Sequence, residues 1–144
     1  GNEYTATRQL DKALMDRFTV IEMDLLNQEE EAGLLHYMFP SVDKDILSNV
    51  ASIADLTRME ALSESARISS GVSTRTSVEI AGLLFDGFSL LEAADITIYP
   101  QYDSSGGVDS ERTFVKQIVQ KFVSDGSEEE LFTEHDMNES DNDY

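Results

Sequence analysis

Two arginines, Arg17 and Arg75, occupy positions that suit chemistry on an anionic ligand. Arg17 ends a short charged and apolar segment, and a strand-like run begins at Phe18. Arg75 falls in the expected first turn of a helix capped by Ser73, where a cation opposes the helix dipole at a cost of about 0.3–1 kcal/mol. Each has a plain explanation, since Arg17 would suit the C-terminal end of a helix and Arg75 would be tolerated at a wet surface. The alternative is that Arg75 meets an anionic partner and Arg17 reaches a group outside its own domain.

Other chemistry finds little support in the residues. His36 and His135 are far apart, and neither has a carboxylate at a convincing metal-ligand spacing. The stretch "DMNESDND" lacks the sixth-position glycine and the closing glutamate of a calcium loop. No glycine–lysine pair occurs, so the chain carries no P-loop, and no apolar strand ends in Asp-Glu to hold magnesium. We therefore expect no metal site and no nucleotide hydrolysis by this chain alone.

Composition indicates one folded domain followed by an acidic tail. The chain has 144 residues, 40% of them hydrophobic, and a net charge of −19. Residues 124–144 hold nine acidic side chains and no lysine or arginine, which predicts a disordered tail. The scattered basic residues argue against general nucleic-acid binding. The absence of cysteine, of a signal peptide and of a long apolar run is consistent with a cytoplasmic protein that does not enter a membrane.

Hydrophobic periodicity and capping residues predict a mainly α chain with one or two strands at its N-terminal end. Asn27 with Glu30, and Ser89 with Glu92, match the capping-box pattern, and Gly87 suits the position that closes a helix. A lone strand cannot form a sheet, so the chain is expected to be a fragment or a processed piece. We predict a strand over 18–26 and helices over 10–17, 28–38, 44–66, 74–86, 90–99 and from 109 or 110 to 123.

The order of these segments resembles the second half of an AAA+ ATPase module. The closest pattern is that of the MoxR-like group, which includes the ATPase subunit of aerobic cobaltochelatase. In this chain it consists of a strand end at Asn2, a helix ending in Asp16-Arg17-Phe18, a strand, and a helix opening with "QEEEAGLL". Val72-Ser73-Thr74-Arg75 matches the start of a helix in that family's lid. The resemblance covers residues 1 to about 123 and is strongest over 1–35 and 71–88.

The resemblance implies roles for three residues. Asn2, or less well Glu3, would be the sensor 1 residue that orients the attacking water. Arg17 would be an arginine finger for the neighbouring subunit's ATP, and Arg75 would be the sensor 2 arginine that touches the phosphates from the lid. The family also implies ATP and Mg²⁺ in the complete protein, a homo-oligomeric ring of about six subunits as in that family, and a partner with an integrin-like metal-binding domain.

The resemblance divides the chain into the rear of an α/β core at 1–39, a helical lid at 40–123 and the acidic tail at 124–144. Two other functions remain open. A non-enzymatic helical adaptor with an AAA+-like lid would explain why Walker motifs are missing from this chain. An acidic inhibitor that mimics nucleic acid would explain the charge, although the tail offers few apolar anchors.

Overall fold

The computed structural model describes residues 26–123, and over that range the protein is all-α. The mainly α expectation is confirmed in this coarser form. Several predictions lie outside the described residues: the helix over 10–17, the site residues Asn2 and Arg17, and the acidic tail. The strand predicted over 18–26 also lies outside them, except for its last residue, Leu26, which is not in a strand. The helices are α2 (Gln28–Met38), α3 (Lys44–Leu62), α4 (Thr74–Phe85), α5 (Leu90–Thr97) and α6 (Glu111–Val123), with 3₁₀ turns η2 (Tyr99–Gln101) and η3 (Gly107–Asp109).

Helices α2 and α5 begin at the capping boxes that the sequence predicts. The Asn27 side chain accepts a hydrogen bond from the Glu30 amide at 2.8 Å, and the Glu30 carboxylate accepts one from the Asn27 amide at 3.1 Å. Ser89 and Glu92 make the same reciprocal pair at 3.1 and 3.0 Å. Amide groups that a helix leaves without partners are thus satisfied locally, which is why both starts can be predicted from four consecutive residues.

Helix α4 closes at Gly87, as the sequence predicts. Gly87 has a φ of +99°, and its amide donates to the Leu84 carbonyl while the Phe88 amide donates to the Leu83 carbonyl. This pair of bonds is the Schellman arrangement, and glycine is favoured there because a left-handed backbone costs it no steric strain. The helix therefore stops here, and α5 begins three residues after Gly87, at Leu90.

Helix α3 ends at Leu62, four residues before the predicted end at residue 66. The backbone of Ser63 is extended, and its hydroxyl donates to the Glu60 carbonyl at 2.9 Å. Such a side-chain bond competes with the next helical turn. Leu62 is 87% exposed, so burial does not favour extending the helix either.

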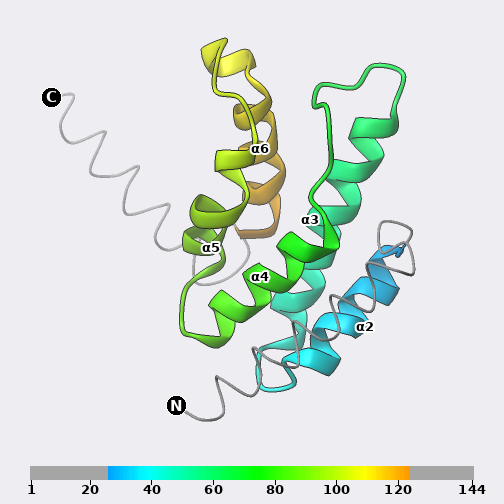
Figure 1. Ribbon diagram of the computed structural model, residues 1–144, viewed down its shortest axis with the longest axis vertical. Coiled ribbons are helices and arrows are strands. Elements are labelled where there is room, and N and C mark those ends of the chain that lie inside the picture. The colour runs from blue at the N-terminus through cyan, green and yellow to red at the C-terminus, as the bar shows by residue number, and fades with distance from the viewer. Residues whose placement is uncertain (1–25, 124–144) are drawn as a thin grey trace, which may run out of the picture.

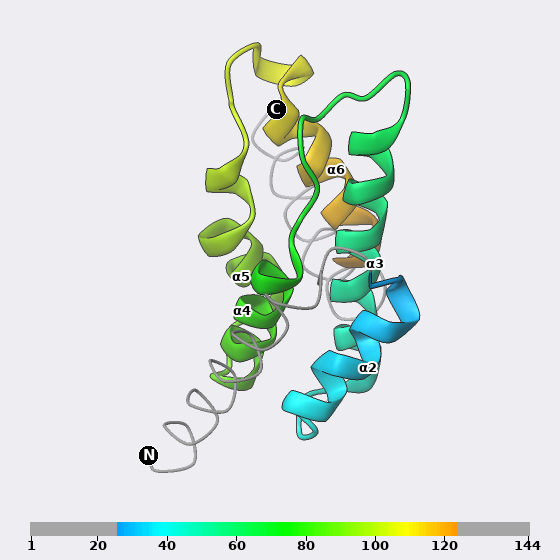
Figure 2. The ribbon, with the colours of Figure 1, turned by 45° about the vertical axis from the view of Figure 1, so that its right-hand side comes forward.

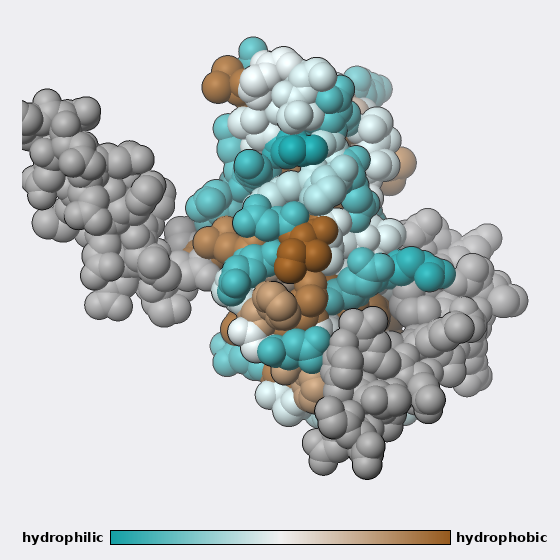
Figure 3. Space-filling model, turned by 60° about the vertical axis from the view of Figure 1, so that its left-hand side comes forward, coloured by the Kyte–Doolittle hydropathy of each residue, from teal (hydrophilic) through white to brown (hydrophobic). Residues whose placement is uncertain are grey.

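The long helix α3 contacts α2, α4 and α6, and its course can be followed in Figures 1 and 2. Helix α5 packs on α4 and α6. The core is continuous across these helices and includes Leu35, Phe39, Leu47, Val50, Ile53, Val72, Ile80, Ile98, Val115 and Val119. On the face drawn in Figure 3, apolar side chains gather in the lower half and are bordered by polar ones. None of the helices between Leu26 and Val123 has the length and apolar character needed to span a membrane.

Candidate functional site

The start of α4 presents Arg75 on the outside of the bundle. The Ser73 side chain caps this helix by accepting a hydrogen bond from the Thr76 amide at 3.1 Å. Thr74 and Ser77 are fully buried, whereas Arg75 is exposed. Because an α-helix turns about 100° per residue, the buried pair faces the core and Arg75 faces away from it. The first turn of α4 therefore has an anchored side and a side that can meet a ligand.

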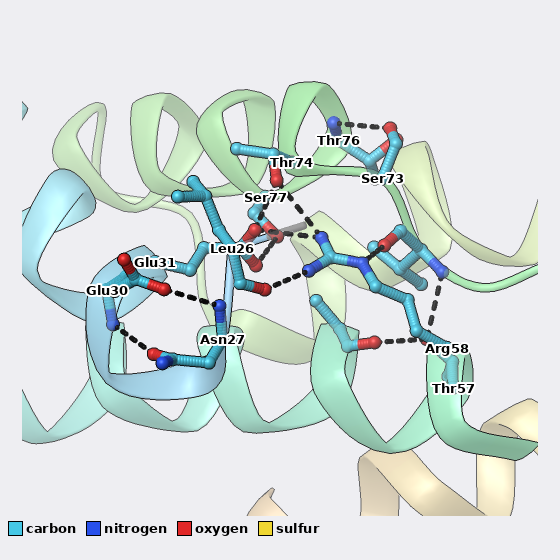
Figure 4. Close-up of polar contacts among 12 residues, drawn as sticks. Leu26, Asn27, Glu30, Glu31, Thr57, Arg58, Ser73, Thr74, Thr76 and Ser77 are labelled. Carbon is cyan, nitrogen blue, oxygen red and sulfur yellow. Dashed lines mark hydrogen bonds and ion pairs between the residues drawn. The ribbon is translucent and has the colours of Figure 1, made fainter. Parts of the chain in front are cut away.

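Glu31 anchors the inner side of that turn. Its side chain is fully buried, and its carboxylate accepts hydrogen bonds from the hydroxyls of Thr74 and Ser77, the latter at 3.0 Å (Figure 4). It also pairs with the Arg58 guanidinium at 2.8 Å. A buried carboxylate is tolerated only when it is paired and hydrogen-bonded, and Glu31 meets both conditions. These residues, Glu31, Arg58, Thr74 and Ser77, are called the anchor cluster below.

Arg58 joins the anchor cluster to the chain on both sides of it. Its Nε donates to the Val72 carbonyl at 2.8 Å, and its Nη2 donates to the Thr74 hydroxyl at 3.2 Å as well as to Glu31. Its Nη1 approaches the Leu26 carbonyl at 3.5 Å. One guanidinium, with its side chain 15% exposed, thus contacts the entry to α2, the body of α2, and the entry and first turn of α4.

The loop that leads into α4 is held along most of its length. The Val72 amide donates to the Thr57 hydroxyl at 2.9 Å, and the Ser70 carbonyl accepts from the Tyr102 hydroxyl at 2.9 Å. At Gly71 an added Cβ would lie 2.6 Å from backbone atoms of Arg58, so only glycine lets the loop run this close to α3. The loop that precedes Arg75 is therefore attached to α3 and to Tyr102.

Burial also affects the tyrosine that holds this loop. It raises the pKa of Tyr102 to about 12, and the nearby Glu111 carboxylate adds to the shift. The phenol is thus protonated at neutral pH, as its hydrogen bond to Ser70 requires.

The anchor cluster is built to hold structure and not to react. Glu31 is enclosed and already accepts from three side chains, so no solvent-borne substrate reaches it. Within residues 26–123, no three histidine, cysteine or acidic side chains gather as metal ligands would. The part of this site that faces outward is Arg75, a cation at a helix N-terminus, where phosphate oxygens can also accept from backbone amides.

A hollow lies at the opposite end of α4 from Arg75. It has a volume of about 510 Å³ and is lined by the start of α3 and the ends of α4 and α6, with Ile46, Leu84, Phe88 and Phe122 among its side chains. Among the described residues that line it, Asp43 is the ionisable one, and its carboxylate accepts the amides of Asp45 and Ile46 as the cap of α3. The hollow therefore brings no catalytic group to Arg75.

Of the three site residues inferred from the sequence, Arg75 is the one that the described residues include, and it lies at the exposed start of α4. Asn2 and Arg17 lie outside the described part of the chain. The sequence reasoning missed Arg58 entirely and named Glu31 only as part of the acidic opening of a helix, "QEEEAGLL". A signal was present: Glu31 lies four residues before Leu35, on the apolar face of α2, where a carboxylate needs a buried partner.

No known protein family matches the chain, and no curated protein is similar to it. The function is therefore inferred from the residues and from the geometry around Arg75.

Proposed function

We propose that this chain is the C-terminal portion of a ring-forming AAA+ ATPase of the MoxR-like or cobaltochelatase-like branch. In the complete protein, ATP and Mg²⁺ are bound by segments that this chain does not contain. Hydrolysis remodels a partner protein or drives a chelatase-like complex, and the partner carries an integrin-like metal-binding domain. The helical part from 40 to 123 acts as the lid, and Arg75 is its sensor 2 arginine.

One observation carries this proposal: Arg75 sits on the exposed side of a helix start whose inner side is tied to the point where residues 1–25 join the bundle. Arg58 contacts both Leu26 and Thr74, at 3.5 and 3.2 Å. A lid arginine that senses nucleotide has to be close to the junction with the core domain. A triphosphate next to the first turn of α4 would also offset the cost of a cation there, about 0.3–1 kcal/mol.

The roles of the other two residues follow from the same proposal. Asn2 orients the attacking water, and Arg17 stabilises charge on the γ-phosphate bound by the neighbouring subunit. An arginine supplied from outside the nucleotide's own subunit accelerates such reactions by about 10³–10⁵-fold. Arg75 acts within its own subunit and couples the nucleotide to the lid.

ATP hydrolysis by the complete protein tests these roles. Arg17→Ala is expected to reduce turnover to near zero and leave ATP binding intact, whereas Arg75→Ala weakens binding or hydrolysis within one subunit. Mixed rings separate the two, because an Arg17→Ala subunit impairs its neighbour's site and an Arg75→Ala subunit impairs its own. Equal activity of wild-type, Arg17→Ala and Arg75→Ala rings would contradict the proposal.

A helical adaptor is the second candidate, and the surface of α3 favours it. Leu56, Met59 and Leu62 are 37, 61 and 87% exposed and recur at three-residue spacing along the end of that helix. We take these exposed apolar side chains of α3 as the surface that such an adaptor would use to bind its partner. If the complete protein is an adaptor, it should bind a partner through Met59 and Leu62 and should not bind ATP. A P-loop encoded before Gly1 would favour the ATPase instead.

A further inference from the structure

We propose that Glu31 is a positioning residue for Arg75, and this inference rests on the proposed function. Glu31 fixes the rotation of the first turn of α4, and that rotation sets the direction in which Arg75 leaves the helix. The residue acts through α4 and does not touch the nucleotide.

The geometry of the anchor cluster supports this role. Thr74 and Ser77 are three residues apart, so their side chains lie about 60° apart around the helix axis and one turn apart along it. Both hydroxyls donate to the same carboxylate (Figure 4). Two attachment points at different heights resist both rotation and sliding of the helix. Arg75 lies between them in sequence, about 130° around the axis from their midpoint, so any rotation of the anchored side moves Arg75 by the same angle.

Arg58 extends this link to the segment before α2. Its guanidinium holds Glu31 and Thr74 and also approaches the Leu26 carbonyl, where residues 1–25 join the bundle. A displacement of that junction relative to α3 therefore strains the same hydrogen bonds that orient Arg75. Glu31 and Arg58 together connect the core-proximal end of α2 to the arginine that would sense nucleotide.

A cycle of variants in the complete protein tests the inference through the affinity for a fluorescent ATP analogue with Mg²⁺. The variants are Glu31→Gln, Arg75→Ala and the two combined. Substitutions along a network that does not touch the ligand change affinity by about two- to thirtyfold. We expect Glu31→Gln alone to weaken binding within that range and to have no further effect once Arg75 is alanine, because its effect passes through Arg75.

Two further variants guard against misfolding and unrelated charge effects. Ser77→Ala removes one donor to Glu31 without changing charge, and it is expected to weaken binding less than Glu31→Gln but also only when Arg75 is present. Glu60→Gln is the matched control, because Glu60 pairs at 3.0 Å with Arg67, whose side chain is 69% exposed, and it should leave affinity within about twofold. Thermal unfolding of each variant shows whether it is folded.

The outcomes separate this inference from the proposed function. If Arg75→Ala does not change ATP binding, the proposed function fails and the positioning role falls with it. If Arg75→Ala weakens binding but Glu31→Gln and Ser77→Ala have no effect, or weaken binding equally with and without Arg75, the positioning role alone is overturned.

Discussion

The Glu31 carboxylate and the Arg58 guanidinium lie 2.8 Å apart where α2, α3 and the first turn of α4 meet. The two residues are 27 positions apart in sequence. Glu31 is fully enclosed, whereas the Arg58 side chain keeps 15% of its surface exposed. The two charges therefore differ in how well water could compensate for the loss of the partner.

That difference predicts unequal losses of stability. Arg58→Met leaves a carboxylate buried without a cation and is expected to lower the free energy of unfolding by about 3–5 kcal/mol. Glu31→Gln leaves a guanidinium that water can still reach and is expected to cost about 1–3 kcal/mol. Urea unfolding of the 144-residue chain measures both. Arg67→Met removes a 69% exposed guanidinium that pairs with Glu60 and lies 4.2 Å from the centre of the Phe114 ring; it is the control and should cost less than Arg58→Met, about 1–2 kcal/mol. A larger loss for Glu31→Gln than for Arg58→Met would contradict this assignment.

Two glycine-to-alanine substitutions are expected to change stability in opposite directions. At Gly71 the new methyl group would lie 2.6 Å from the backbone of Arg58, and the resulting shift of the loop is expected to cost about 1–3 kcal/mol. At Gly33, inside α2, a Cβ meets no atom within 4 Å, so alanine is expected to stabilise the protein by about 0.5–1 kcal/mol. Thermal or urea unfolding distinguishes the two; a neutral Gly71→Ala would show that the loop is not held against α3.

The buried tyrosines predict a loss of stability at alkaline pH. Burial raises the pKa of both Tyr99 and Tyr102 to about 12, with smaller contributions from the Asp95 and Glu111 carboxylates. A tyrosine in the unfolded chain has a pKa of about 10, so between about pH 10 and pH 12 the unfolded state releases protons that the folded state keeps. The contribution of the two buried phenols to the free energy of unfolding is therefore fully present below about pH 10, and it is lost as the pH rises towards 12.

Urea unfolding between pH 8 and pH 11.5 measures this fall. Tyr102→Phe removes one of the two phenols and should make the decline with pH shallower, although it also removes the bond to the Ser70 carbonyl and lowers stability at neutral pH. Tyr37→Phe controls for the loss of a surface hydroxyl, since Tyr37 is 70% exposed. Stability that stays constant up to pH 11.5 would mean that the tyrosines are more accessible than described.

The helix starts could be predicted because their determinants are local. Asn27 with Glu30, and Ser89 with Glu92, satisfy helix amides within four residues, and Gly87 terminates α4 through its own backbone freedom. The predicted end of α3 at residue 66 was wrong. The Ser63 hydroxyl competes for the Glu60 carbonyl, and the exposed Leu62 gains no burial from a longer helix. Such competition depends on tertiary burial, which apolar periodicity alone does not report.

The candidate site could be predicted only in part, for the same reason. Arg75 was singled out by its place in a helix start and by the resemblance, and its role stays a prediction, but the cluster beside it depends on Glu31 and Arg58, which come from different helices. In the sequence, Glu31 is one of three consecutive glutamates, and the helix dipole gives a sufficient reason for all three. What distinguishes Glu31 is which face of α2 meets α3 and α4, and that is a property of the assembled bundle.

The most direct measurement is the dissociation constant for Mg²⁺-ATP of the complete protein carrying Arg75→Ala, compared with wild type and with Arg67→Ala. Both variants remove one arginine charge, and the Arg67 side chain is 69% exposed and already paired with Glu60. A sensor 2 role for Arg75 predicts about tenfold or greater weakening for Arg75→Ala, the loss of a charge-assisted bond to phosphate, and little change for Arg67→Ala. Equal affinities for all three proteins would contradict the proposal that this helix start binds a triphosphate.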